Sequence, residues 1–159
     1  MSGDVMEKLW ALAPAFVEGI PQGKALGIKF VSVDVGKATF ALPYSTKIIG
    51  DPATRVIHGG AITTLLDQVS GLAATSAIVN EANDINIANV ATLDLSIDYM
   101  RPAKPGETVI GTATCYKTTH HIAFVRAIAH DGDINDPVAM CQATFMITRN
   151  KPSKPEAGS

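Results

Sequence analysis

The segment IHGGAITTLLDQVSGLAATSAIV, residues 57–79, decides the fold of this 159-residue chain. From Gly59 onward, apolar side chains recur at helical spacing and keep one broad face apolar: Ile62, Leu65, Leu66, Val69, Leu72, Ala73 and Ala77. This spacing predicts a long helix over about 59–79. The segment is also rich in glycine and alanine, which permits a sheet or another helix to approach it closely.

The residues that follow this helix predict a sheet. After a polar, turn-like stretch at 80–89, apolar and polar side chains alternate over 91–100, with Ala91, Leu93, Leu95, Ile97 and Tyr99 on one face and Thr92, Asp94, Ser96 and Asp98 on the other. Two prolines in 101–106 must end this strand, since proline donates no hydrogen bond to a ladder. Three more strand-like stretches follow at about 108–117, 122–130 and 138–148.

The residues before the long helix predict a helix and two strands. Apolar positions at helical spacing favour a helix over 5–18, which we expect Pro21 and Gly23 to end. Strand-like stretches follow at 28–35 and 37–42, and a loop at 43–57. Because strands do not alternate with helices, the fold class is α+β, with an antiparallel sheet lying on one long helix.

Composition and length fit one domain. Apolar residues make up 47% and charged residues 18%, which suffices for one sizeable core. We assign residues 1–148 to this domain and expect a disordered tail over 149–159, because the tail has almost no apolar side chains. The formal net charge of −2 lacks the electrostatic signature of a nucleic-acid or membrane-surface protein.

Sequence features also predict a cytoplasmic protein. The longest stretch without Asp, Glu, Lys or Arg, residues 68–80, is shorter than the roughly 20 residues of a membrane-spanning helix. Charged residues near the N-terminus do not fit a secretory signal. Cys115 and Cys141 form no C-x-x-C pair and are too few for a disulfide framework, which fits a reducing compartment.

The strongest chemical signal lies at the start of the 59–79 helix. Gly59 and Gly60 open the helix, so the free N–H groups of its first turn are accessible to a ligand. These donors and the positive end of the helix dipole suit an oxyanion that develops during a reaction. Asp67 follows two turns later and is the only charged side chain between His58 and Asn80, counting histidine as neutral.

Asp67 shares a narrow helical stripe with Thr64, Gln68, Gly71 and Thr75. One interpretation is that the stripe is simply the solvated face of the helix. Since it contains no Lys, Arg or Glu, it fits a face turned towards a cleft or a partner subunit better.

Several common sites are missing from the sequence. There is no G-x-S-x-G nucleophile elbow, and neither a phosphate-binding loop nor a dinucleotide fingerprint occurs. His120, His121 and His130 match no zinc-binding spacing, so we predict no metal site.

Taken together, His58-Gly59-Gly60, Asp67 and the strand TLDLSIDYMRPA at 92–103 resemble the hotdog-fold acyl-CoA thioesterases of the PaaI type. The resemblance covers about residues 26–148. It implies an antiparallel sheet wrapped around one long central helix, with protomers joined edge to edge into a homodimer or homotetramer. It also implies hydrolysis of acyl-CoA at the dimer interface without a cofactor, because coenzyme A is part of the substrate.

The resemblance assigns roles to several residues of the site. Asp67 matches the catalytic carboxylate, which acts as general base or as nucleophile. The N–H of Gly59, with that of Gly60 as a second candidate, matches the oxyanion donor, and His58 matches the histidine that shapes this turn. Thr92 matches the hydroxyl residue that positions the water, and we expect it to act from the facing subunit.

Substrate contacts are the other implication of the resemblance. Asp51 stands in Gly50-Asp51-Pro52, where many relatives carry Asn-Pro, and an ionised aspartate does not donate a hydrogen bond to a substrate oxygen as asparagine does. The basic residues Arg101, Lys104 and Lys117 are candidates to bind the coenzyme A phosphates, or ordinary solvated charges.

Two other functions remain open from the sequence. The first is a hotdog hydratase or dehydratase that acts on a 2-enoyl chain. The second is a non-catalytic acyl-CoA-binding module, although no DNA-binding domain is appended that would make it a regulator. Assays of enoyl-CoA hydration, and tight binding without hydrolysis, distinguish these functions from a thioesterase.

Overall fold

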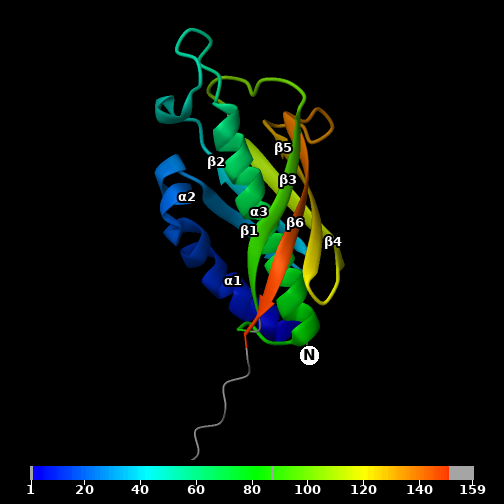
Figure 1. Ribbon diagram of the computed structural model, residues 1–159. Helices are drawn as coiled ribbons and strands as arrows, with labels where there is room; N and C mark the ends of the chain where they lie inside the picture. Colours follow the sequence, from blue (N-terminus) through cyan, green and yellow to red (C-terminus); the bar gives the residue numbers. More distant parts are fainter. Residues whose placement is uncertain (1, 87, 151–159) are drawn as a thin grey trace, which may run out of the picture.

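A computed structural model describes residues 2–86 and 88–150, in which a six-stranded sheet packs on one long helix (Figure 1). In chain order the elements are α1 (Ser2–Gly19), α2 (Pro21–Leu26), β1 (Lys29–Asp34), β2 (Lys37–Leu42), the 3-10 turn η1 (Thr46–Ile48), α3 (Gly59–Ala82), β3 (Ala88–Tyr99), β4 (Val109–Thr118), β5 (Ile122–His130) and β6 (Ala139–Arg149). The strand order is β1-β2-β4-β5-β6-β3, and every neighbouring pair is antiparallel. The predicted α+β class and central helix are confirmed.

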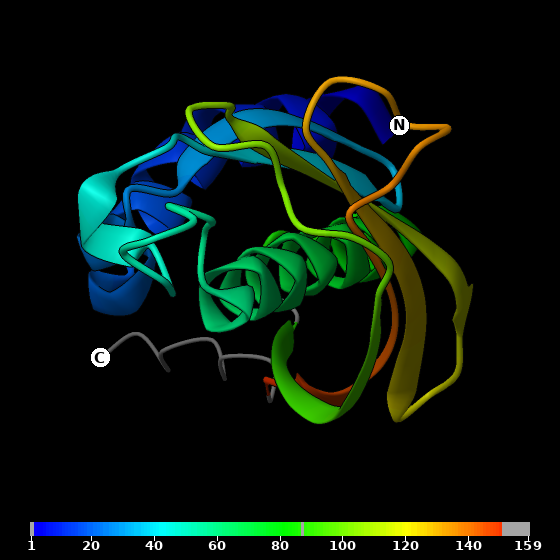
Figure 2. The same ribbon diagram turned by 90° about the horizontal axis from the view of Figure 1, so that it is seen from above.

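The sheet curves around α3, which runs through the middle of the molecule (Figure 2). The α3 residues Leu65, Leu66 and Val69 are fully buried. In β4, a Cβ at Gly111 would lie 3.0 Å from Leu65 Cγ, so this glycine allows the helix to come close to the sheet. Each such buried aliphatic side chain stabilises the fold by about 1.5–3 kcal/mol.

The length and composition of α3 alone would permit it to span a membrane. Of its most apolar 18-residue window, however, 67% is buried inside the protein. Within the part of the chain that the structure describes, this apolar helix is therefore the core around which the sheet folds.

The N-terminal region contains a helix that the sequence did not predict. The N-terminal helix ends before Pro21 as predicted, since α1 runs from Ser2 to Gly19, but a second helix, α2, begins at Pro21 itself. Proline is tolerated at the first position of a helix, where the N–H that it lacks would have no intrahelical partner. Gly27, with φ 82°, ends α2 in the left-handed conformation.

The predicted alternation along 91–100 was wrong at its start. Thr92 pairs with Phe145 and Asp94 with Thr144, so Leu93 is the extra residue of a β-bulge. On the N-terminal side of the bulge, the face that points towards α3 is therefore the one that carries Thr92 and not the one that carries Ala91. Leu95 and Ile97 pack on the core as predicted, but Leu93 is 49% exposed.

The C-terminal strand runs further than the sequence indicated. Arg149, which we assigned to the disordered tail, belongs to β6 and pairs with Ala88. Asn150, also assigned to the tail, donates its side-chain N–H to the Asn86 carbonyl at 2.6 Å, and residues 151–159 lie outside the described residues.

Candidate active site

The first turn of α3 has one backbone donor available for a ligand. His58 caps the helix, and its Nδ1 accepts a hydrogen bond from the N–H of Gly60 at 2.8 Å. The N–H of Ala61 donates to the His58 carbonyl, and the His58 N–H donates to Ile48. Among the described residues, the N–H of Gly59 has no partner. Of the two glycines proposed as oxyanion donors, Gly59 is therefore the free one.

Other side chains lie close to both glycines of this turn. A Cβ at Gly60 would lie 2.9 Å from Nδ1 of His58, too close to the imidazole ring that caps the helix. A Cβ at Gly59 would lie 3.3 Å from the Tyr99 ring. The Tyr99 hydroxyl donates to the Gly59 carbonyl at 3.0 Å and contacts the Thr63 hydroxyl. The end of β3 thus holds the turn in place.

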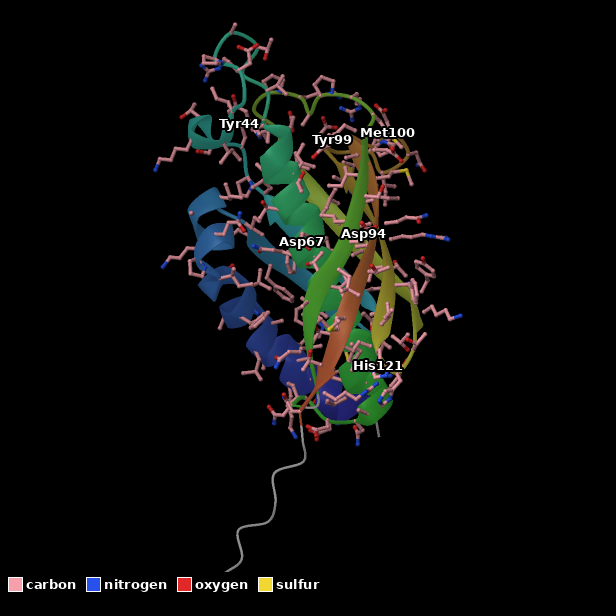
Figure 3. All side chains as sticks on the ribbon, in the orientation of Figure 1. Tyr44, Asp67, Asp94, Tyr99, Met100 and His121 are labelled. Atoms are coloured by element: carbon pink, nitrogen blue, oxygen red, sulfur yellow. The ribbon has the colours of Figure 1, made fainter. Side chains whose placement is uncertain are left out.

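Asp67 lies on α3 beside β3 (Figure 3). The hydroxyl of Thr92 donates to Asp67 Oδ1 at 2.7 Å. No Lys, Arg or His of the described chain forms an ion pair with Asp67. One carboxylate oxygen is therefore held by Thr92, while the other is free to accept a proton from water.

Thr92 reaches Asp67 because of the bulge in β3, which turns its side chain towards the helix. The sequence predicted that Thr92 acts from a facing subunit. The structure brings it against the Asp67 of its own chain.

Asp67 and Thr92 line a cavity of about 390 Å³ between α1, α3 and the start of β3. Gln68, Gly71 and Thr75 of the polar stripe line it too, whereas Thr64 does not. The expectation that the stripe faces a cleft is confirmed for these residues.

Within one chain, the Gly59 N–H and the Asp67 carboxylate are far apart. Asp67 follows Gly59 by eight helical residues, which corresponds to about 12 Å along the helix axis. A carbonyl group that accepts a hydrogen bond from the Gly59 N–H therefore lies beyond the reach of a water molecule on the Asp67 of the same chain.

Asp51 stabilises a turn in the loop before α3. Its carboxylate accepts the N–H of Ala53 at 2.9 Å, and this hydrogen bond is the main reason that the pKa of Asp51 is lowered. The neighbouring Gly50 packs against His58, because a Cβ there would lie 3.2 Å from His58 Cα. Asp51 is thus beside the first turn of α3 and does not line the cavity of Asp67.

Arg101 joins two loops of the protein. Its guanidinium donates to both carboxylate oxygens of Asp131, at 2.9 and 2.6 Å, and forms an ion pair with Asp136 at 3.2 Å. The Lys104 N–H also donates to Asp131 at 2.8 Å. Because these groups engage the guanidinium, the structure argues against Arg101 as a phosphate ligand.

The hydrogen-bonded ion pair between Arg101 and Asp131 leads to a prediction about how stability depends on pH. The hydrogen bonds from Arg101 hold the pKa of the buried Asp131 carboxyl well below its usual range. The carboxylate therefore stabilises the fold above pH 4, and this contribution is lost as the pH falls towards the lowered pKa. We expect Asp131→Asn to lower the Tm at pH 7 by roughly 5 °C, and the difference to shrink in acid.

Thermal melts of both proteins between pH 3 and pH 7 test this prediction. Glu107→Gln, which alters an exposed carboxylate in the same loop region, is the matched control and should melt like the wild type. Equal melting temperatures for Asp131→Asn and the wild type at pH 7 would contradict it.

The two candidate lysines are exposed and lie far from each other. Lys104 precedes β4, whereas Lys117 is near the other end of that strand. Since the strand between Val109 and Lys117 is about 25 Å long, one chain does not bring both lysines to the same phosphate.

The family model for the thioesterase superfamily matches residues 55–138, a segment that contains the α3 turn, Asp67 and Thr92. The chain belongs to the thioesterase superfamily. The predicted class of enzyme, a thioester hydrolase with the hotdog fold of the PaaI type, is confirmed.

Two curated thioesterases of Escherichia coli K12 are similar to this superfamily member. The medium/long-chain acyl-CoA thioesterase YigI is 26% identical over 139 residues, which are 83% of this chain and 88% of YigI. The acyl-coenzyme A thioesterase PaaI is 30% identical over 106 residues, which are 67% of this chain and 68% of PaaI.

Solved structures give the same fold. A Pseudomonas aeruginosa crystal structure matches this thioesterase-superfamily chain with a TM-score of 0.71 and 38% identity, over 89% of this chain and 98% of that one. The structure of E. coli PaaI has a TM-score of 0.76 over 91% and 96% of the two chains. At 22% identity, the PaaI structure supports the fold alone.

Sequence reasoning missed two parts of the site. Tyr99 was only part of the strand motif, although it holds the Gly59 turn. The α1 residues Leu12 and Phe16 line the cavity, and each is more than half exposed. On a helical wheel, Leu12 and Phe16 share one broad apolar face with the buried Leu9 and Ala13, so the sequence pattern gave no signal that separates cavity residues from core residues.

Cysteine nucleophiles do not compete with Asp67. Cys115 and Cys141 are free thiols, and burial raises the pKa of both. Each thiol is therefore protonated at neutral pH and poorly nucleophilic.

Proposed function

We propose that this protein hydrolyses acyl-CoA thioesters to a free acid and coenzyme A at a site shared by two chains. Asp67 of one chain and the Gly59 N–H of the other act on the same thioester. The observation that carries the proposal is Asp67, held by Thr92 at the wall of a mostly apolar cavity. The E. coli relatives named for acyl-CoA support the substrate class.

The chemistry follows from these groups. A water molecule donates to the free Asp67 oxygen and attacks the thioester carbonyl carbon while its proton passes to the carboxylate. The carbonyl becomes a tetrahedral oxyanion that accepts the Gly59 N–H. As the intermediate collapses, the C–S bond breaks, and the proton from Asp67 completes the thiol of coenzyme A. No cofactor takes part in this sequence.

A nucleophilic role for Asp67 would instead form a mixed anhydride with the acyl group. In a single turnover in H₂¹⁸O, label on Asp67 identifies the nucleophilic route. Attack by water puts ¹⁸O in the released acid, whereas attack by Asp67 followed by hydrolysis at the aspartyl carbonyl leaves the ¹⁸O on the enzyme.

The need for two chains rests on geometry. About 12 Å separates Gly59 from Asp67 along one helix. The strand β3, which carries Thr92, is at one edge of the sheet, and its outer side has no partner strand within the described residues. Pairing of this edge with a second copy would form a homodimer, or a homotetramer of two dimers. Light scattering should then give a mass well above the 16.7 kDa of one chain.

Release of thiol across a panel of short, long and aromatic acyl-CoAs tests the proposal. We expect turnover of at least one class, together with no hydration of the matching 2-enoyl-CoA. Hydration without thiol release would favour a hydratase, and tight binding without either reaction would favour a binding module.

The free thiols of Cys115 and Cys141 fit our proposal that the reaction takes place in the cytoplasm.

A further inference from the structure

The cavity beside Asp67 is lined mainly by apolar side chains from helices and strands. From α1 come Leu9, Leu12 and Phe16, from α3 comes Leu72, and from β6 comes Phe145. Among the described residues, Asp67 is the only charged one in the cavity wall. A cavity of this kind, apolar with a reactive carboxylate at its wall, fits an apolar ligand that carries its reacting group at one end.

Gly71 keeps part of this cavity open. It lies one helical turn after Asp67 in the interior of α3, where glycine is less favourable than alanine. Its backbone does not require glycine, because its φ is not positive. A Cβ there would meet only the Phe145 ring, at 3.7 Å, which is an ordinary contact. Packing within the described chain therefore does not explain why residue 71 is glycine and not a residue with a side chain.

The outer wall of the cavity is apolar and incomplete. Leu12 is 56% exposed and Phe16 is 67% exposed, although both line the cavity. Exposed apolar side chains at the rim of a cavity lose contact with water when an apolar ligand enters, which favours binding.

We propose that this cavity receives the acyl chain of the substrate, and that Gly71 determines how long a chain it accepts. The inference rests on the proposed thioesterase function. The cavity follows α3 from Asp67 to Thr75, about 12 Å, which matches a saturated chain of roughly ten carbons. The substrate class is therefore medium-chain fatty acyl-CoA, with the thioester beside Asp67 and the methyl end near Thr75.

Two substitutions test the role of Gly71. In Gly71→Ala and Gly71→Leu, the new side chain enters the space of the acyl chain. We expect Gly71→Leu to lower kcat/KM for decanoyl-CoA relative to butanoyl-CoA at least tenfold, and Gly71→Ala to act in the same direction but less. The Tm of Gly71→Ala should equal or exceed that of the wild type, a combination that loss of structure does not produce.

Gly19→Ala provides the matched control. Gly19 is also helical, has nothing within 4 Å of a Cβ, and does not line the cavity. Its profile of kcat/KM against chain length should equal that of the wild type.

Two outcomes would overturn the inference. One is a chain-length profile of Gly71→Leu that runs parallel to that of the wild type; a changed oligomer mass in the same variant would then indicate that a second copy occupies the cavity. The other is a wild-type preference for butanoyl-CoA over decanoyl-CoA.

Failure of the thioesterase proposal would be seen separately, as absence of thiol release by the wild type from every acyl-CoA. In that case calorimetric titration with decanoate tests the cavity alone. Binding that Gly71→Leu weakens at least tenfold would support the acyl site, and equal binding by both proteins would overturn it.

Discussion

Replacing Asp67 with asparagine is expected to lower kcat for the best acyl-CoA by about 10³-fold while the protein remains folded. Asparagine has the same shape, and its side-chain oxygen can still accept the hydrogen bond from Thr92. It has no negative oxygen to take a proton from water or to attack the thioester. The measurements are steady-state kinetics of thiol release and a thermal melt, with a Tm close to that of the wild type.

Asp94→Asn is the matched control for this prediction. Asp94 is an exposed carboxylate on the same strand as Thr92, just beyond the bulge (Figure 3). Its replacement removes the same charge, and kcat should stay within about twofold of the wild type. If Asp67→Asn retained near wild-type turnover, or if Asp94→Asn lost as much, Asp67 would not be the catalytic carboxylate.

Replacing Gly59 with proline should lower kcat by about 10²–10³-fold, because it removes the one free N–H of the turn. Proline suits the first position of a helix. The preceding His58 has φ −61° and ψ 133°, an extended conformation that proline tolerates in its neighbour. No hydrogen bond within the described chain is lost, so the Tm should change little.

Gly59→Ala separates the N–H from the added bulk. Both substitutions place a Cβ about as close to Tyr99 as the 3.3 Å contact indicates, and Tyr99 is 52% exposed, so its ring has room to move. Alanine keeps the N–H, and we expect kcat to fall less than tenfold. Equal losses in the two variants would mean that crowding, rather than a missing oxyanion donor, causes the effect.

Mixed oligomers of these variants test whether two chains share the site. After Asp67→Asn and Gly59→Pro chains are refolded together, half of the sites in each hybrid dimer combine an intact Gly59 with an intact Asp67. Random pairing then restores about a quarter of wild-type activity. If each site belonged to one chain, every site would carry one defect and the mixture would stay inactive.

Much of the fold was predictable from the sequence because it depends on local spacing. The helical period of 59–79 and the absence of βαβ alternation gave the central helix and the antiparallel sheet. Asp67 stood out because 58–80 contains no other charged side chain. The end of the first helix before Pro21 was also predicted, but α2 was not, because a proline that stops one helix can also begin the next.

By itself, the sequence determined the central helix, the sheet class and the motif that contains Gly59 and Asp67, since each follows from neighbouring residues. Only the tertiary structure decided that the Gly60 N–H is hydrogen-bonded to His58 and that a bulge turns Thr92 towards Asp67. It also decided that Arg101 is hydrogen-bonded to Asp131. It alone placed α1 at the cavity. The physical reason is that these contacts depend on strand register and long-range packing, which one-residue shifts change without altering the local pattern.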